Sequence, residues 1–275
     1  MSSCGQKEKV SKESISQAEN TIDSMSDSRQ ALSENLKIDH FNLWTNTPEL
    51  LKQKLVEAGF TVVPDSLIQP HQGQGTRGKY INFLNMYFEI IYINNEEEFK
   101  SNQIANPLLD FETRGNYLEN GASPFSIALR MKEYVVEKIP FETVAYHQSW
   151  MDEEAISIRA AKSSKTKFSE PSVFIINPGN NEEFESIEEL VAKIPEQYAI
   201  WREFFKHKNG AKKVTNIQLH IQRTHEISNT IQVLNSLEDI QILDDTSQYI
   251  EIDFDNKEQD ITLDFRPDFP VIFRL

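Results

Sequence analysis

The 275-residue chain is poor in cysteine, in basic residues and in long apolar runs, and each shortage excludes a class of protein. Cys4 is the single cysteine, so neither an intramolecular disulfide nor a cysteine-based metal cluster can form. The 28 basic residues are outnumbered by 43 acidic ones, and the net charge of -15 disfavours nucleic acid as a partner. The most apolar stretches, such as Tyr87 to Ile93, are only long enough for strands, so no transmembrane segment is predicted.

Residues 1–35 form a polar segment that we interpret as a disordered tail or tether. Met1-Ser2-Ser3-Cys4-Gly5 is similar to the end of a bacterial lipoprotein signal, in which small residues precede a lipidated cysteine. Two interpretations stay open. Either Cys4 carries a lipid anchor, which makes the protein a cell-envelope lipoprotein if a signal lies upstream of Met1, or the thiol is incidental and the protein is cytoplasmic.

Order is expected to begin near Leu36, where alternating residues up to Trp44 predict a strand. A helix follows from Thr47 as N-cap and Pro48 at the first helical position, and Gly59 ends it. Three further strands are predicted over 60–63, 79–84 and 86–93. On the first strand, alternation places four side chains on one face: Ile38, His40, Asn42 and Trp44.

The same order of elements recurs more faintly in two further places. From Pro124 a strand, a short helix over 132–138 and strands over 144–150, 156–161 and 173–176 are predicted. Two helices are expected between 182 and 205, and a third set of strands and one helix begins at Val214. In this third set Asn216 takes the position of His40, and Glu251 is assigned to a third strand. The sequence thus predicts an α+β fold built from degenerate copies of one unit.

Four sequence pieces in residues 36–94 resemble the glyoxalase-like branch of the vicinal oxygen chelate superfamily (glyoxalase/bleomycin resistance/dioxygenase). They are Ile38-Asp39-His40, Gly59-Phe60-Thr61-Val62, His71-Gln72-Gly73-Gln74-Gly75-Thr76 and Tyr87-Phe88-Glu89-Ile90-Ile91. The resemblance implies paired βαβββ modules (36–94 and 124–178) whose curled mixed sheets surround a cleft. Residues 36–178 would form this glyoxalase-like domain, and 179–275 a helical connector and a third, degenerate βαβββ-like module at the C-terminus.

By the same resemblance, His40 and Glu89 occupy metal-ligand positions on the first and fourth strands of the first module. Imidazole and carboxylate suit Zn, Ni, Mn, Fe or Co, and Glu89 would also serve as the catalytic general base, a role that a raised pKa would favour. In the second module Ser126 stands at the position of His40, and the strand over 173–176 is apolar, so half of the ligand set is missing. His71 or His147 would then have to complete the coordination shell.

Other polar residues are candidates for binding a ligand in the cleft. The glycine-rich loop would fold over the cavity mouth, since it lacks the lysine and the following helix that a nucleotide-binding loop needs. Arginines on strands of the second module could receive a carboxylate. The substrate-binding candidates are His71, Thr76, Arg130, His147 and Arg159. For each of them a structural role in a turn, in core packing or in a surface ion pair is the alternative.

Two functions are therefore considered. The first is an enzyme with a divalent metal on His40 and Glu89 that acts on a small oxygen-rich molecule as a lyase, isomerase or dioxygenase. The second is a metal-free protein on the same fold that binds or sequesters a small molecule, with Arg130, Arg159 and His71 as ligand contacts. The partner in both is a small molecule, and the sequence leaves a homodimer open.

Overall fold

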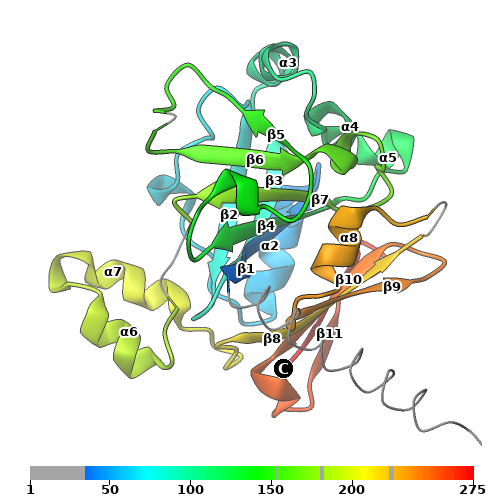
Figure 1. Cartoon of the computed structure of the whole chain (residues 1–275). Coiled ribbons are helices and arrows are strands. Elements are labelled where there is room, and N and C mark those ends of the chain that lie inside the picture. The colour runs from blue at the N-terminus through cyan, green and yellow to red at the C-terminus, as the bar shows by residue number, and fades with distance from the viewer. Residues whose placement is uncertain (1–34, 153, 180–182, 223–225) are drawn as a thin grey trace, which may run out of the picture.

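The computed structural model describes residues 35–152, 154–179, 183–222 and 226–275. Residues 1–34, including Cys4, lie outside this range. The described chain folds into a seven-stranded and a five-stranded mixed sheet, with helices packed around them (Figure 1). The predicted α+β class is confirmed, and both sheets are open rather than closed into barrels. The predicted pairing of βαβββ modules stays a prediction.

The first sheet, sheet A, has the strand order β2-β3-β1-β4-β7-β6-β5. β4 lies at its centre, parallel to β7 and antiparallel to β1, and β1 is parallel to β3. The strands are β1 (Leu36–Trp44), β2 (Thr76–Asn82), β3 (Tyr87–Ile93), β4 (Phe125–Met131), β5 (Thr143–Tyr146), β6 (Ser157–Ala161) and β7 (Ser172–Asn177).

The second sheet, sheet B, has the order β11-β12-β10-β8-β9. β8 is parallel to β9 and antiparallel to β10, and β10 is parallel to β12. The strands are β8 (Val214–Ile221), β9 (Ile240–Asp244), β10 (Tyr249–Phe254), β11 (Thr262–Asp264) and β12 (Val271–Arg274).

Helices connect the strands and cover their ends. Asn95 accepts two backbone N–H groups and begins α3, and the hydroxyls of Ser186 and Ser228 begin α6 and α8 in the same way. The α-helices are α2 (Pro48–Glu57), α3 (Glu96–Ala105), α4 (Phe111–Gly115), α5 (Tyr117–Asn120), α6 (Ile187–Lys193), α7 (Ala199–Arg202) and α8 (Asn229–Leu234). No helix within the described residues is both long and apolar enough to cross a bilayer.

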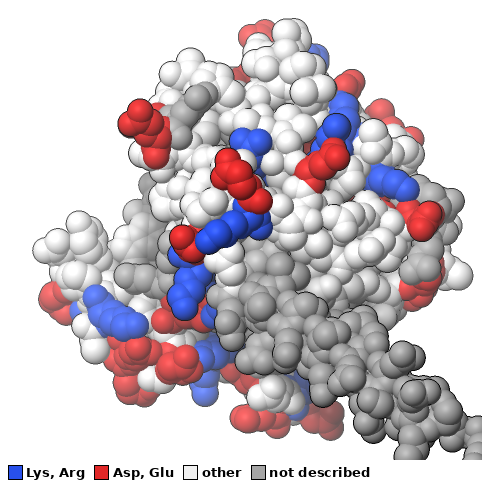
Figure 2. Space-filling model, in the orientation of Figure 1, with Lys and Arg blue, Asp and Glu red and all other residues white. Residues whose placement is uncertain are grey.

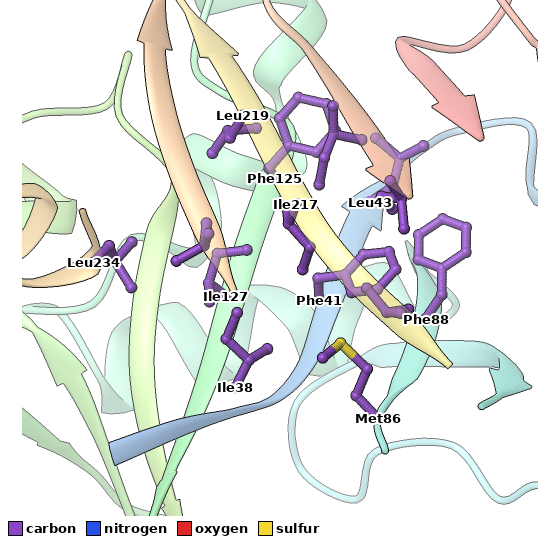
Figure 3. Packing of buried hydrophobic residues seen from close by; sticks show 14 of the residues in the cluster. Ile38, Phe41, Leu43, Met86, Phe88, Phe125, Ile127, Ile217, Leu219 and Leu234 are labelled. Carbon is purple, nitrogen blue, oxygen red and sulfur yellow. The ribbon is translucent and has the colours of Figure 1, made fainter. Parts of the chain in front are cut away.

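One hydrophobic core lies between the two sheets (Figure 3). Sheet A contributes Phe41, Phe88 and Ile127, and β8 of sheet B crosses over them with Ile217 and Leu219. All five side chains are at most 1% exposed. Each such side chain contributes about 1.5–3 kcal/mol by leaving water, so the two sheets stabilise each other.

The opposite face of sheet A is free of this core and carries polar and aromatic residues, as alternation along each strand requires. On β1, Phe41 and Leu43 enter the core whereas His40, Asn42 and Trp44 point to the other side. The predicted face is therefore right for these three residues.

Ile38 is the exception to the predicted face, because it belongs to the core between the sheets. The pairing of β1 with β4 shifts by one residue between Ile38 and His40, so Asp39 is the extra residue of a β-bulge. The bulge reverses the alternation at this point and leaves Asp39, which is fully buried, next to His40. A pattern of apolar and polar residues contains no signal for such an insertion.

Several predicted elements differ from the structure. Residues 60–63 are not a strand, although the Val63 N–H donates to the Tyr80 carbonyl of β2. The helix predicted over 132–138 is only a 3-10 turn, Val136–Lys138. α3, α4 and α5 were not predicted individually, and neither was β12.

The surface carries charges of both signs (Figure 2). Lys and Arg side chains lie beside Asp and Glu side chains over much of the face in view, so no broad basic patch covers that face. Exposed pairs such as Lys138 with Glu133 contribute little stability in water.

Candidate functional site

A cavity of about 360 Å³ lies on the polar face of sheet A. Its floor is formed by β1, β3, β4, β6 and β7, and its walls by the loop after α2 and by α4. Most of the lining is apolar or aromatic, including Trp44, Phe111, Tyr146 and Phe174. This volume and this mixture of groups are typical of sites for small molecules.

His40 stands on the cavity floor with its orientation fixed from two sides. Its Nδ1 lies 2.6 Å from Oδ1 of Asp39, the bulge residue. Its ring lies parallel to that of Tyr87, with 4.2 Å between the centroids. Asp39 accepts a hydrogen bond from Nδ1, and the other nitrogen, Nε2, points toward Glu89, whose Oε2 is 3.9 Å away.

Glu89 is buried in β3 and is surrounded by groups that favour its charged form. Its Oε1 lies 3.2 Å from Nε2 of His71 and accepts a hydrogen bond from the Tyr80 hydroxyl at 3.1 Å. Gly78 makes room for this arrangement, since a Cβ there would overlap the carboxylate and the Tyr80 hydroxyl. His40, Glu89, His71 and Tyr80 thus form one polar cluster on the cavity wall, which we call the His–Glu cluster.

The pKa values in the cluster follow from burial and from the two opposite charges. Burial alone would raise the pKa of Glu89, but His71 and His40 outweigh it, and the pKa is lowered. Burial alone would lower the pKa of His71, but Glu89 raises it above its ordinary value. A raised pKa of Glu89, which would favour a role as general base, is therefore not found, and His71 is the group shifted toward neutral pH.

The two tyrosines beside the cluster stay protonated. Burial and the Glu89 carboxylate raise the pKa of both Tyr80 and Tyr87 well above the ordinary value. Each phenol is therefore available as a hydrogen-bond donor at neutral pH.

The glycine-rich loop forms one lip of the cavity mouth, as predicted. Its first residue, His71, accepts or donates at Nδ1 to the Thr76 hydroxyl over 2.8 Å, which holds the imidazole against Glu89. The loop is tied to the facing segment, because Gln148 Nε2 donates to the Gly73 carbonyl and Trp150 Nε1 to the Gln72 carbonyl, both at 2.9 Å. The mouth is therefore bordered by two connected loops.

One polar atom in the cavity lacks a partner. Oδ1 of Asn42 is buried and makes no hydrogen bond, although Asn42 is only 4% exposed and lines the cavity. A buried carbonyl oxygen without a donor is costly, and a ligand hydroxyl or amide would satisfy it. Asn42 was predicted on this face, but not as a ligand contact.

The remaining predicted site residues are distributed differently. Thr76 is fully buried and supports His71 without lining the cavity. Arg130 forms an ion pair with Glu183, and the Nε of Arg159 donates to the Thr143 hydroxyl at 2.8 Å. His147 is exposed, and its backbone binds Asn106. These last three residues do not line the cavity, so their predicted placement in the cleft is wrong.

Sequence reasoning missed two charged residues at the cavity, Asp110 and Arg114. Arg114 is 1% exposed, and its Nε lies 2.7 Å from Oδ2 of Asp110. The guanidinium also donates to four backbone carbonyls, those of Ser123, Ser164, Phe168 and Glu170. The i,i+4 spacing of Asp110 and Arg114 was the available signal, but this pattern is more often found on exposed helices.

The donor set for a metal ion falls short of a complete site. His40 and Glu89 face each other, as the resemblance implies, and Asp39 orients His40 in the way that carboxylates orient metal-bound histidines. His71 is close to Glu89 but hydrogen-bonded to it. Within the described ranges, no group of three or more His, Cys, Asp or Glu side chains is arranged to hold a metal ion.

Sheet B repeats the histidine arrangement. The ring of His220 lies parallel to that of Tyr249 at 4.0 Å, its Nδ1 is 3.1 Å from Asp245, and its Nε2 is 3.9 Å from Glu251. By its contacts His220, and not the predicted Asn216, corresponds to His40. Glu251 is paired with Arg274, a permanent cation, whereas Glu89 is paired with the titratable His71.

Comparisons with known proteins leave the family open. No family model matches the chain, and no curated protein matches it. A solved structure described as a hypothetical protein from Staphylococcus aureus is similar over 87% of this chain and 98% of that chain. The sequence identity is 13% and the TM-score 0.49, and at this level the likeness carries no argument about function.

Proposed function

We propose that this protein binds a small molecule, with at least one hydroxyl, amide or carbonyl group and an apolar body, in the cavity on sheet A, without requiring a metal. The single observation that carries the proposal is the buried, unpartnered Oδ1 of Asn42, a residue that lines the largely aromatic cavity. Aromatic walls favour the body of such a molecule, and the His–Glu cluster and Asn42 fix its polar group.

The His–Glu cluster gives the bound molecule a proton donor and a proton acceptor. Protonated His71 can pass a proton to a ligand oxygen and take it back as neutral imidazole, while the Glu89 carboxylate, 3.2 Å from Nε2, stabilises the cation. Asp39 accepts a hydrogen bond from Nδ1 of His40, which holds Nε2 toward Glu89 and the cavity. Proton transfer to or from a bound hydroxyl or carbonyl is the chemistry that these residues support.

A thermal-shift and calorimetry series with phenol, catechol and benzoate tests this proposal. We expect the hydroxylated molecules to raise the melting temperature more than benzoate, because their O–H groups can donate to Asn42. Asn42→Leu keeps the volume but removes the acceptor, so it should weaken phenol binding about tenfold. Ile104→Ser, on a residue that is 82% exposed on α3, is the control. Equal binding by Asn42→Leu and the wild type would refute the proposal.

A second candidate function is a metal-assisted lyase, isomerase or dioxygenase of the glyoxalase-like type. The orientation of His40 by Asp39, with Nε2 toward Glu89, favours it. His40 and Glu89 would hold the ion, with His71 as the third donor once it leaves Glu89. A bound ion would supply a Lewis acid for neighbouring substrate oxygens.

Metal binding can be measured directly. The purified protein would be loaded with Zn, Ni, Mn, Fe or Co, and bound metal counted by mass spectrometry beside the thermal shift. A stoichiometric ion that is lost in His40→Ala but retained in His147→Ala favours the enzyme. Stabilisation by phenols with no retained metal favours the metal-free binder.

The strand order supports, as part of the same proposal, a degenerate pair of modules in sheet A. β4, β7, β6 and β5 run in the order first, fourth, third, second, with the first and fourth strands parallel. β1, β3 and β2 follow the same order up to the position of the missing strand at 60–63. A relationship to the glyoxalase-like superfamily would explain both halves.

A further inference from the structure

A second cavity, of about 490 Å³, lies next to the first. One side is formed by the ends of β2 and β3 and the turn between them, including Asn82, Asn85 and Met86. The other side is formed by α6, α7 and the segments around them, which stand to one side of the sheets (Figure 1).

The two cavities share a wall. Tyr80 and Tyr87 line both of them, and their rings contact each other with 5.7 Å between centroids. The Tyr80 hydroxyl donates to Glu89, and the Tyr87 ring lies against His40. Both tyrosines therefore contact the His–Glu cluster as well as the second cavity. A molecule lying across these two rings would reach from the cluster into the second cavity.

The lining of the second cavity is mainly apolar and includes partly exposed side chains. Tyr198 is 53% exposed, and Trp201 and Phe205 are partly exposed beside it. Burial of aromatic and aliphatic surface is favourable, so these rings suit an alkyl or aryl group. Lys193 at the margin is held by Glu189 at 2.9 Å, which leaves little positive charge for an anionic ligand.

We propose that the second cavity is a subsite of the first, so that the natural ligand is elongated, with a hydrogen-bonding head at Asn42 and the His–Glu cluster and an apolar tail against Tyr198, Trp201 and Phe205. This inference rests on the proposed function, because the head is placed by the first cavity. It adds a substrate class: molecules with an oxygen-bearing head and a tail of several carbons, rather than small polar metabolites.

A series of 4-n-alkylphenols, from methyl to octyl, tests the inference by isothermal titration. The phenol is the head, and each added methylene should increase the affinity about fourfold once the chain enters the second cavity. Tyr198→Ser and the double variant Tyr198→Ser/Trp201→Ser remove the apolar wall, so they should flatten this dependence while leaving 4-methylphenol affinity unchanged. Ile200→Ser, at a site that is 58% exposed on the same helix and outside the cavity lining, should change neither quantity.

The outcomes separate the subsite from the proposed function. If 4-methylphenol binds and depends on Asn42 but longer chains gain nothing in the wild type, the subsite is wrong and the proposed function stands. If the gain persists in the double variant, the tail lies elsewhere and the subsite is again wrong. If no alkylphenol of any length binds, both proposals fall.

Discussion

Nε2 of His71 lies 3.2 Å from Oε1 of Glu89, and this contact joins the loop at the cavity mouth to the floor of the cavity. Glu89 is buried and His71 is partly exposed, and each shifts the pKa of the other in the direction that favours the charged form. The histidine cation and the carboxylate therefore coexist over a wider range of pH than either would alone.

The first prediction concerns the titration of His71. Its pKa should lie above 6.5, and in Glu89→Gln it should fall below 6.5, because burial then acts without the carboxylate. The chemical shift of the imidazole Cε1 proton over a pH series measures both values.

The pKa shifts of His71 and Glu89 also determine how the free energy of unfolding depends on pH. The raised pKa of His71 stabilises the fold below about 6.5, and this contribution is lost as the pH rises through its folded pKa. The lowered pKa of Glu89 stabilises the fold above about 4.5, and this contribution is lost as the pH falls through its folded pKa. An unfolding free energy that differs between wild type and Glu89→Gln by the same amount at every pH would contradict the assignment.

The second prediction concerns His207, which connects the segment after α7 to the end of β2. Its Nδ1 accepts the Thr61 N–H at 3.0 Å, and its Nε2 lies 2.9 Å from the Asn82 carbonyl, so the ring is neutral. Burial lowers its pKa from 6.5 to about 4. Between these values the unfolded chain binds the proton and the folded chain does not, so the free energy of unfolding should decrease by about 3 kcal/mol as the pH falls from 6.5 to 4.

His207→Gln is the comparison for this effect, because its amide can replace both hydrogen bonds without titrating. Chemical denaturation at a series of pH values should show a smaller decrease for the variant than for the wild type over that interval. Parallel curves would contradict the buried neutral imidazole.

The third prediction concerns the ion pair of Arg114 with Asp110 beside the cavity. Arg114→Met should lower the free energy of unfolding by about 3–5 kcal/mol, because a buried carboxylate and several carbonyls lose their donor. Arg266→Met removes an exposed pair with Asp264 and should cost at most about 1 kcal/mol. Urea denaturation of both variants measures the contrast, and similar costs would contradict it.

The fourth prediction concerns the space that Gly78 leaves for Glu89. Gly78→Ala should displace the Glu89 carboxylate and the end of the Tyr80 ring, since a Cβ would overlap both. The free energy of unfolding should fall by about 1–3 kcal/mol, the His71 pKa should fall and phenol binding should weaken. Gly121→Ala, where nothing lies within 4 Å of the added Cβ, should leave the His71 titration unchanged.

The sequence predicted the parts of the fold that depend on local pattern. Alternation placed His40, Asn42 and Trp44 on one face, and Pro48 marked the start of α2. It could not predict that Asp39 is a bulge, because the inserted residue is defined only by pairing with β4. The apolar run over 60–63 has strand composition, yet it packs against His207 instead of joining the sheet.

Some residues of the site were also predictable, because their positions depend on the local strand pattern. His40, Glu89 and His71 line one cavity, as expected from their positions. Arg130, Arg159 and His147 do not line it, because their contacts are to residues distant in sequence or to solvent. Asp110 and Arg114 lie between the predicted modules, where no alternating pattern indicated a strand or a site residue.

The repeated arrangement of His220 on Tyr249 gives the molecule an internal standard for spectroscopy. Both histidines experience a ring current from a parallel tyrosine and the field of a nearby aspartate and glutamate. A ligand in the cavity should move the resonances of His40 and leave those of His220 in place, whereas a change in salt or temperature should move both. One spectrum can therefore separate occupancy of the cavity from a general response of the protein.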